Sequence, residues 1–135
     1  MRSSLSVLVY SSNANTRAEV LRAAGTRLAA DLPPITWREC ATLPALLRTL
    51  DRDHIDACVL DAESTPAGGM GVCRQIKNEV FRCPPVLLLI ARPQDAWLAG
   101  WSQADDTLTS PVDPLACAAS LAALLRARPA RPAGS

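Results

Sequence analysis

IDACVLD, residues 55–61, is the stretch that decides the fold: it is apolar from Ala57 to Leu60 and ends on the acid Asp61. The segment has the length of a strand, and a loop rich in Ser, Thr, Pro and Gly follows it over residues 62–69. A continuous apolar run is typical of a strand that is buried on both faces of a parallel sheet. We therefore expect a central parallel strand with Asp61 at its carboxyl end.

Segments of two kinds alternate on both sides of this stretch. Four further segments read as strands: apolar runs over residues 5–10 and 86–91, and short strands over residues 35–40 and 106–109. Apolar residues recur at helical spacing over residues 14–30, 44–50, 70–80, 96–102 and 114–126. Pro33 and Pro34 are expected to stop the first helix, and Asp113 to cap the last. Five successive strand–helix units predict an α/β domain, with a doubly wound parallel sheet and helices on both of its faces.

The composition favours one globular domain. We expect it to span residues 1–126, with a disordered tail over residues 127–135. The formal net charge of +1 gives no electrostatic reason to bind nucleic acid or an anionic membrane surface. No apolar run is long enough for a membrane span, and we find no secretory leader at the start of the chain. We therefore expect a cytoplasmic protein.

The five cysteines argue against a metal or redox centre. None forms a C-x-x-C pair, and the single histidine, His54, has no second histidine to act with. An odd cysteine count without a leader fits reduced thiols better than a disulfide framework. We expect no bound metal and no cofactor.

The ends of the strands are where functional side chains are expected, because ligands of doubly wound sheets bind beyond the carboxyl ends of the strands. Ser11 and Ser12 follow the first strand, and Asp61 ends the third. Ile90 lies at the end of the fourth strand, and Ser110-Pro111 follows the fifth.

Four segments resemble the receiver domain of response regulators in their order and spacing. They are VLVYSSN at 7–13, CVLDAESTPAGGMGVCRQIK at 58–77, VLLLIARPQD at 86–95 and ADDTLTSPVDP at 104–114. The resemblance extends to about Arg126, and it is most specific around Asp61 and at Ser110-Pro111. It implies a five-stranded flavodoxin-like sheet of strand order 2-1-3-4-5.

The resemblance also places the family's phosphorylation residues. The phosphoacceptor aspartate matches Asp61, whereas the two acids after the first strand match Ser11 and Ser12. The loop after Asp61 is about two residues longer than usual before Gly71. Glu63, two residues beyond the acceptor, is a weak candidate for a second acid.

The remaining family positions fall on the fourth and fifth strands. The hydroxyl that ends strand four matches Ile90, and the lysine before the retained Pro111 matches Ser110. The aromatic switch residue of strand five falls on Thr107. Only the acceptor, the proline and a glycine are kept.

These losses weaken phosphoryl transfer, because the transfer joins two anions and the family uses Mg²⁺ to neutralise them. A single certain carboxylate with hydroxyls around it is a poor site for Mg²⁺, so we expect Mg²⁺ binding to be weak or absent. Asp61 is then expected to accept hydrogen bonds from Ser11, Ser12, Ser110 or loop amides. A residual phosphate acceptor and an acid that faces a ligand are the alternatives.

Three other features leave alternatives open. Trp97 and Trp101 stand four residues apart on one helix face, and they either cover the sheet edge or form an exposed interaction patch. Receivers commonly pair through the fourth helix, fifth strand and fifth helix, so a homodimer through that face is one expectation, and the last helix packs inside the domain or across that dimer. Trp37 is expected beside the core, and the Gly68–Gly71 run as a flexible loop.

The sequence therefore favours a stand-alone pseudo-receiver. It would be a regulatory module without enzymatic activity that signals through an unidentified protein partner, independently of phosphorylation. One alternative is a phosphorylatable response regulator with Asp61 as acceptor, and another is a small-molecule sensor domain.

Overall fold

Five parallel strands form one sheet in the order β2-β1-β3-β4-β5 in the computed structural model, which describes residues 3–127. The strands are β1 Leu5–Tyr10, β2 Ile35–Cys40, β3 Ala57–Asp61, β4 Val86–Ile90 and β5 Asp106–Thr109. The helices are α1 Ala14–Ala24, α2 Leu43–Arg52, α3 Gly69–Glu79, α4 Ala96–Ser102 and α5 Pro114–Ala127, with a 3₁₀ turn at Pro93–Asp95 before α4. The expected fold class and strand order are confirmed.

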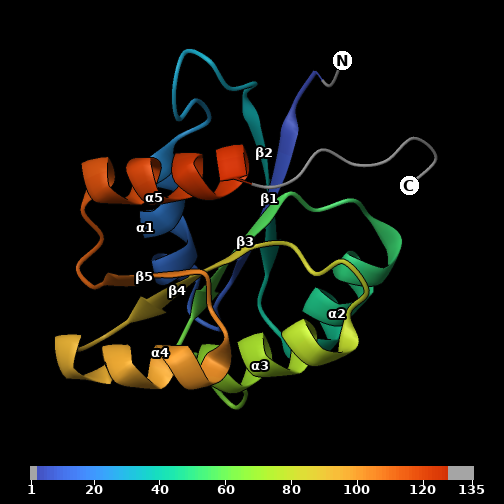
Figure 1. Ribbon diagram of the computed structural model, residues 1–135, viewed down its shortest axis with the longest axis vertical. Helices are drawn as coiled ribbons and strands as arrows, with labels where there is room; N and C mark the ends of the chain where they lie inside the picture. Colours follow the sequence, from blue (N-terminus) through green and yellow to red (C-terminus); the bar gives the residue numbers. More distant parts are fainter. Residues whose placement is uncertain (1–2, 128–135) are drawn as a thin grey trace.

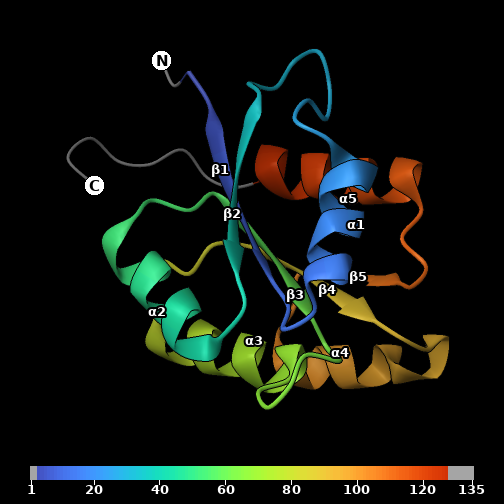
Figure 2. The same ribbon diagram turned by 180° about the vertical axis from the view of Figure 1, so that it is seen from behind.

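Helices cover both faces of the sheet. α1 and α5 lie together on one face, and α2, α3 and α4 lie on the other (Figures 1 and 2). Alternate residues of a strand point to opposite faces, so each central strand supplies both layers of the core. In β3, Cys58 and Leu60 join the cluster under α2–α4, whereas Ala57 and Val59 join the cluster under α1 and α5. Every residue of β3 and β4 is buried, as their apolar sequences predict.

The register of the sheet brings the ends of its central strands level. Tyr10 of β1 stands beside Leu60 of β3, and Asp61 stands beside Leu89 of β4. The residue after β1 is therefore next to the residue that ends β3. This alignment places Ser11 against Asp61.

The first helix is shorter than expected, because it ends at Ala24 and not near residue 30. Gly25 follows with φ +70°, and its N–H donates to the carbonyl of Leu21. With ψ −159°, this backbone conformation cannot continue a helix, and among the residues glycine adopts it at the lowest steric cost. Gly25, and not Pro33-Pro34, is thus the stop signal.

The other boundaries differ by only a few residues. Strand β3 begins at Ala57 and not at Ile55, because the carboxylate of Asp56 accepts the Ser6 amide at 2.8 Å beside the strand. Helix α5 starts with Asp113 as its cap, as expected, and runs one residue past the expected domain end to Ala127. The rest of the expected tail, residues 128–135, lies outside the described residues.

Helix α5 packs within the domain. Cys117 and Leu121 are fully buried in the cluster under α1 and α5, which favours the first of the two alternatives for this helix. Leu115, at its first turn, is 83% exposed. None of the helices in the described range is both long enough and apolar enough to traverse a bilayer.

Replacing Gly25 and Gly100 by alanine should have opposite effects. Gly25→Ala strains a residue at φ +70° and should cost about 1 kcal/mol of unfolding free energy. Gly100 is helical, and a Cβ there would meet open space, so Gly100→Ala should stabilise by about 0.5 to 1 kcal/mol. Urea denaturation of both variants measures the difference. A Gly25→Ala protein as stable as the parent would show that the left-handed turn is not required.

Candidate functional site

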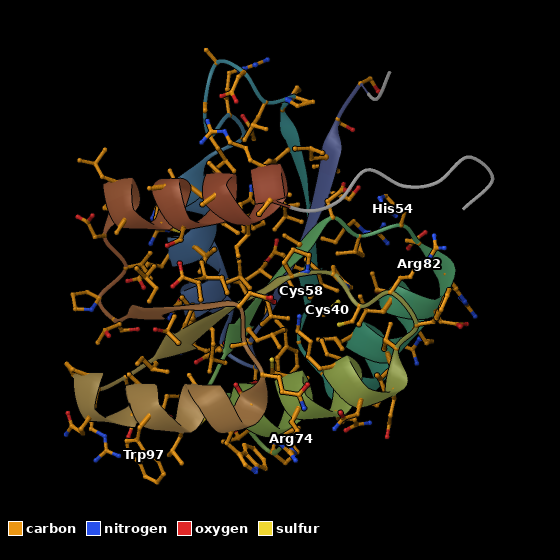
Figure 3. The ribbon with its side chains drawn as sticks, in the orientation of Figure 1. Cys40, His54, Cys58, Arg74, Arg82 and Trp97 are labelled. Carbon is orange, nitrogen blue, oxygen red and sulfur yellow. The ribbon has the colours of Figure 1, made fainter. Side chains whose placement is uncertain are left out.

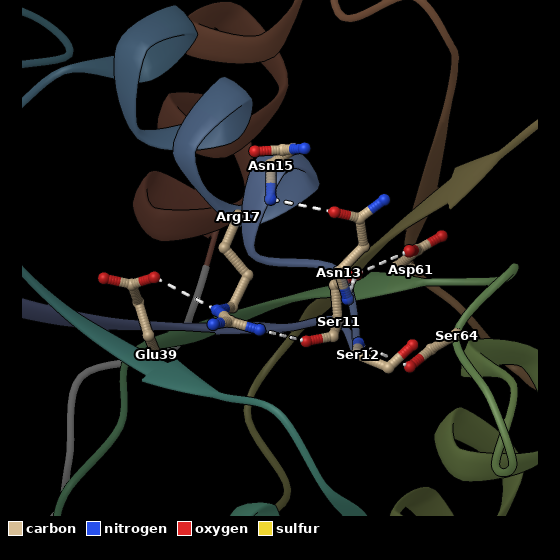
Figure 4. Close-up of polar contacts among 8 residues, drawn as sticks. All are labelled: Ser11, Ser12, Asn13, Asn15, Arg17, Glu39, Asp61 and Ser64. Atoms are coloured by element: carbon tan, nitrogen blue, oxygen red, sulfur yellow. Dashed lines mark hydrogen bonds and ion pairs between the residues drawn. The ribbon is translucent and has the colours of Figure 1, made fainter.

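Asp61 is the acid at the carboxyl edge of the sheet, and its own chain holds both of its carboxylate oxygens. Ser11 Oγ donates to Oδ2 at 2.7 Å (Figure 4). The Glu63 amide donates to Oδ1 at 2.9 Å. Ser11 Oγ in turn accepts the Asn13 amide at 3.0 Å. Because Ser11 is fully buried and Asp61 only 9% exposed, these hydrogen bonds replace most of the water that a free carboxylate would bind.

Ser12 contacts the loop after β3 and not Asp61. Its amide donates to Ser64 Oγ at 2.8 Å, and its hydroxyl accepts the Thr65 amide at 3.1 Å. The hydroxyl of Tyr10 donates to the Ala67 carbonyl at 2.5 Å. We call residues 62–68 the strap, because Tyr10 at the end of β1 and Ser12 just after it hold this loop across the sheet edge.

The expected flexible loop over Gly68–Gly71 is not observed, because Gly68 ends the strap and caps α3, and the other residues of the run belong to the helix. Gly69 is buried and is the first residue of α3. A Cβ on Gly69 would lie 2.6 Å from the Asp61 carbonyl oxygen, and one on Gly68 would lie 2.9 Å from the Ala62 carbonyl oxygen. Glycine is needed here because the helix begins directly against the strand end.

Arg17 fixes the other side of the site, and nothing in the sequence indicated this role. Its Nη1 donates to the Ser11 carbonyl at 2.6 Å, and its Nε lies 3.1 Å from Glu39 Oε1 (Figure 4). The side chain is 16% exposed. Arg17 thereby joins the end of β2 to the turn that carries Ser11.

Within residues 3–127, the side chains at the remaining family positions make no hydrogen bond to the carboxylate of Asp61. Ile90 is buried in the core under α2–α4, and Thr107 lies half-buried on the edge strand β5. Ser110 and Pro111 are exposed. The Ser110 amide donates to the Ile90 carbonyl, but no hydrogen bond within residues 3–127 joins the Ser110 side chain to Asp61. Of the hydroxyls expected to bind Asp61, only that of Ser11 does so.

The charged groups around the site do not form a cation cluster. Arg92 makes two hydrogen bonds to the carboxylate of Asp95, and this contact raises the pKa of its guanidinium, to which the charge of Glu63 also contributes. Glu63 is exposed, and it contacts the Asp61 carboxylate through its backbone amide. Across residues 3–127, no group of three or more His, Cys, Asp or Glu is placed to hold a metal ion.

This donor set does not fit a magnesium site. Mg²⁺ in proteins is held by one or two carboxylates together with waters in octahedral geometry. Here the buried carboxylate of Asp61 already accepts two hydrogen bonds, and the neighbouring hydroxyls of Ser11 and Ser12 are also engaged.

The cysteines behave as small apolar residues. All five are free thiols, and four of them are buried. Burial raises the pKa of Cys73 and of Cys117 to about 11 and that of Cys58 well above its usual value. Thiols of this kind are poor nucleophiles at neutral pH.

The tryptophans of α4 point away from the sheet. Trp97 is 76% exposed and lies on the outer side of α4 (Figure 3). Trp101 is 52% exposed, whereas Ala99 and Ser102 of the same helix are buried. This geometry favours the exposed patch over the alternative in which both rings cover the sheet edge. Trp37 lies beside the core, as expected, and its Nε1 donates to the Gly25 carbonyl at 2.7 Å.

Arg74 of α3 holds Trp101 in place. Its guanidinium carbon lies 4.8 Å from the centroid of the Trp101 ring, and its Nη1 donates to the Trp101 carbonyl at 2.6 Å. A cation over an indole face is attracted by the ring's electron density. We call Trp97, Trp101 and Arg74 the tryptophan surface.

Comparison with known proteins finds close relatives in sequence. Two proteins of Mycobacterium tuberculosis, from strains CDC 1551 and H37Rv, both named uncharacterized response regulatory protein, are 50% identical over 123 residues. The matched region covers 91% of this chain and 92% of theirs. No protein-family model matches the chain.

Solved structures share the fold at low sequence identity. A two-component response regulator from Clostridium difficile superposes with a TM-score of 0.75 at 18% identity, over 91% of this chain and 97% of that one. The signal receiver domain of a histidine kinase from Syntrophus aciditrophicus has a TM-score of 0.75 at 19% identity, over 96% of both chains. A CheY-like receiver domain protein from Methanospirillum hungatei gives 0.71 at 12%, over 92% and 95%.

Removing the Ser11 hydroxyl should destabilise the domain. Ser11→Ala leaves Asp61 without a buried donor and the Asn13 amide without an acceptor, which should cost about 1 to 3 kcal/mol of unfolding free energy. Ser110→Ala is the matched control, because its hydroxyl is exposed at the same sheet edge, and it should change stability by less than about 0.5 kcal/mol. Urea denaturation compares the two. Equal stability of both variants would contradict the structural role of the Ser11 hydroxyl.

Proposed function

This chain belongs to the response regulator receiver family of two-component signalling, and from that premise we propose that it is a pseudo-receiver that signals without phosphorylation of Asp61. The observation that carries the proposal is the occupancy of the Asp61 carboxylate. Both of its oxygens accept hydrogen bonds from the chain itself, and serines stand at the two positions where family members carry acids.

Electrostatics supports the proposal. Attack of a carboxylate on a phosphoryl group brings two anions together, so the reaction needs cations at the site. In this pocket Mg²⁺ should bind weakly or not at all, because Asp61 is the single buried carboxylate and the family lysine is replaced by the exposed Ser110. One hydroxyl and one amide satisfy the carboxylate of Asp61 without a metal ion. We propose that its role is structural: it holds the turn after β1 against the loop after β3. The module would have no enzymatic activity and no cofactor.

The residues on β4 and β5 at the positions that respond to phosphorylation in the family also support the proposal. Ile90 is apolar and buried, so it cannot bind a phosphoryl oxygen, and Thr107 has no ring that could swing between two positions. A switch needs two arrangements whose balance a ligand shifts. With neither residue able to respond, we propose that the domain presents its surface independently of phosphorylation.

The tryptophan surface is the proposed output. Two exposed indole rings on one helix face, with an arginine beside them, have the composition of binding hot spots in protein interfaces. The partner is therefore proposed to be a protein, either a different chain or a second copy through α4, β5 and α5. The net charge of +1 favours neither nucleic acid nor membrane as partner. The cytoplasm is the proposed location, since its reducing conditions suit the five free thiols.

A small-molecule phosphodonor tests the loss of phosphorylation. We expect that incubation with acetyl phosphate and Mg²⁺ leaves the intact mass unchanged, because Asp61 lacks the cations that transfer requires. A canonical receiver treated in parallel is the positive control. Addition of one phosphoryl group to this chain, and its absence from Asp61→Asn, would establish a working phosphoacceptor and overturn the proposal.

Truncation of the two indoles tests the output surface. Trp97→Ala with Trp101→Ala should weaken self-association or partner binding at least about tenfold, as expected for hot-spot residues. Phe81→Ala is the matched control, because Phe81 is 86% exposed but lies outside α4. Sedimentation equilibrium and partner capture measure the effect. If the double variant associates exactly as the parent and the control do, the surface is not the output.

A further inference from the structure

The strap is fastened at several points along its length. At its start, the Glu63 amide donates to Asp61 Oδ1, and the Ser64 amide donates to the Asp61 carbonyl at 3.2 Å. In its middle, Ser12 makes one hydrogen bond to Ser64 and one to Thr65. Ser64 is only 4% exposed, so its hydroxyl is held inside the fold. A loop held at this many points has one conformation while the contacts last.

Helix α3 begins directly after the strap, with no residue between them. Because a Cβ on Gly69 would overlap the Asp61 carbonyl, the first turn of the helix lies directly on the end of β3. Val72, Cys73 and Ile76 then bury one face of the helix in the core. A displacement of the strap would therefore be felt by the first turn of α3.

Helix α3 also contacts the tryptophan surface. Arg74, five residues after Gly69, stacks over the Trp101 ring and binds the Trp101 carbonyl. Lys77 Nζ lies 2.6 Å from Asp105 Oδ2, beyond the end of α4. Contacts of α3 thus hold both the indole and the segment that follows it, and Figure 3 shows Arg74 on α3 in the same helix layer as Trp97 on α4.

We propose that Arg74 couples the strap to Trp101, so that the conformation of residues 62–68 sets the position of the Trp101 ring through α3. This coupling runs along the helix layer and does not use Ile90 or Thr107 of the strands. Arg74 is a positioning residue in this scheme. The inference rests on the proposed function only in taking the tryptophan surface as the output.

Indole N–H signals in a ¹H–¹⁵N spectrum of the full chain measure the coupling, because the chain has three tryptophans and two of them serve as internal references. Ser64→Ala removes the acceptor for the Ser12 amide and should loosen the strap. Hydrogen exchange of the Glu63 and Thr65 backbone amides should become about tenfold faster, because the strap loses one hydrogen bond. The Trp101 signal should move toward its position in Arg74→Ala, while the Trp37 signal stays in place.

Two further variants make the result decisive. Tyr10→Phe removes the hydrogen bond to Ala67 but keeps the ring, so it loosens the strap independently if Ser64→Ala does not fold. In an Arg74→Ala background, either strap variant should leave the Trp101 signal unmoved. Ser110→Ala, at the same sheet edge but without a contact to the strap, should have no effect in any background.

Three outcomes would overturn the inference. They are faster strap exchange with an unmoved Trp101 signal, unchanged strap exchange in both strap variants, and a Trp101 shift that persists without Arg74. None of these measurements uses a phosphodonor. Phosphorylation of Asp61 would therefore overturn the proposed function and leave the coupling to be judged on its own data.

Discussion

The hydrogen bond from Ser11 Oγ to the carboxylate of Asp61 is the contact on which the rest of the site depends. A carboxylate at the end of a fully buried strand must be compensated, because an uncompensated charge in the protein interior costs several kcal/mol. In a site rich in acids, a metal ion supplies the compensation. Here a hydroxyl and a backbone amide supply it, and both belong to residues that the fold already holds in place. The turn after β1 and the loop after β3 are thereby drawn together.

The fold could be predicted from the sequence because its strands are short segments bounded by turn residues, whereas its helices have apolar residues at helical spacing. Strands β1, β2 and β5 have the expected bounds, since each is a segment of strand length that is bounded by polar or turn-forming residues. The end of α1 could not be predicted in the same way. Its apolar spacing continues beyond Ala24, and the backbone conformation at Gly25 overrides that pattern. A glycine inside a helical pattern is ambiguous until its φ angle is known, whereas the proline pair further on gave a stronger but misleading signal.

The site was predictable only in part. The order of the strands indicates which residues lie at the carboxyl edge of the sheet, but not which of their side chains contact one another. Strand ends in a parallel sheet meet, so Ser11 beside Asp61 followed from the order of the strands. The partners of Ser12 and Arg17 did not follow, since Ser64 is 52 residues away from Ser12 and Glu39 is 22 away from Arg17. Neither pair has a spacing that any helix or strand imposes. The cation–π contact between α3 and α4 was invisible for the same reason.

The charge changes at the site are consistent with one another when they are taken together. Serines in place of two acids would leave a lysine at position 110 with fewer anions to balance it, and retained acids without that lysine would repel one another and Asp61. Losing all three leaves a single carboxylate, which one hydroxyl and one amide can satisfy. A neutral hydroxyl can also approach the loop after β3 closely without a bridging ion, as Ser12 does with Ser64 and Thr65. The serines at the two positions where family members carry acids thus join the turn after β1 to the end of β3 and to the strap, since Ser11 binds Asp61 and Ser12 binds Ser64 and Thr65.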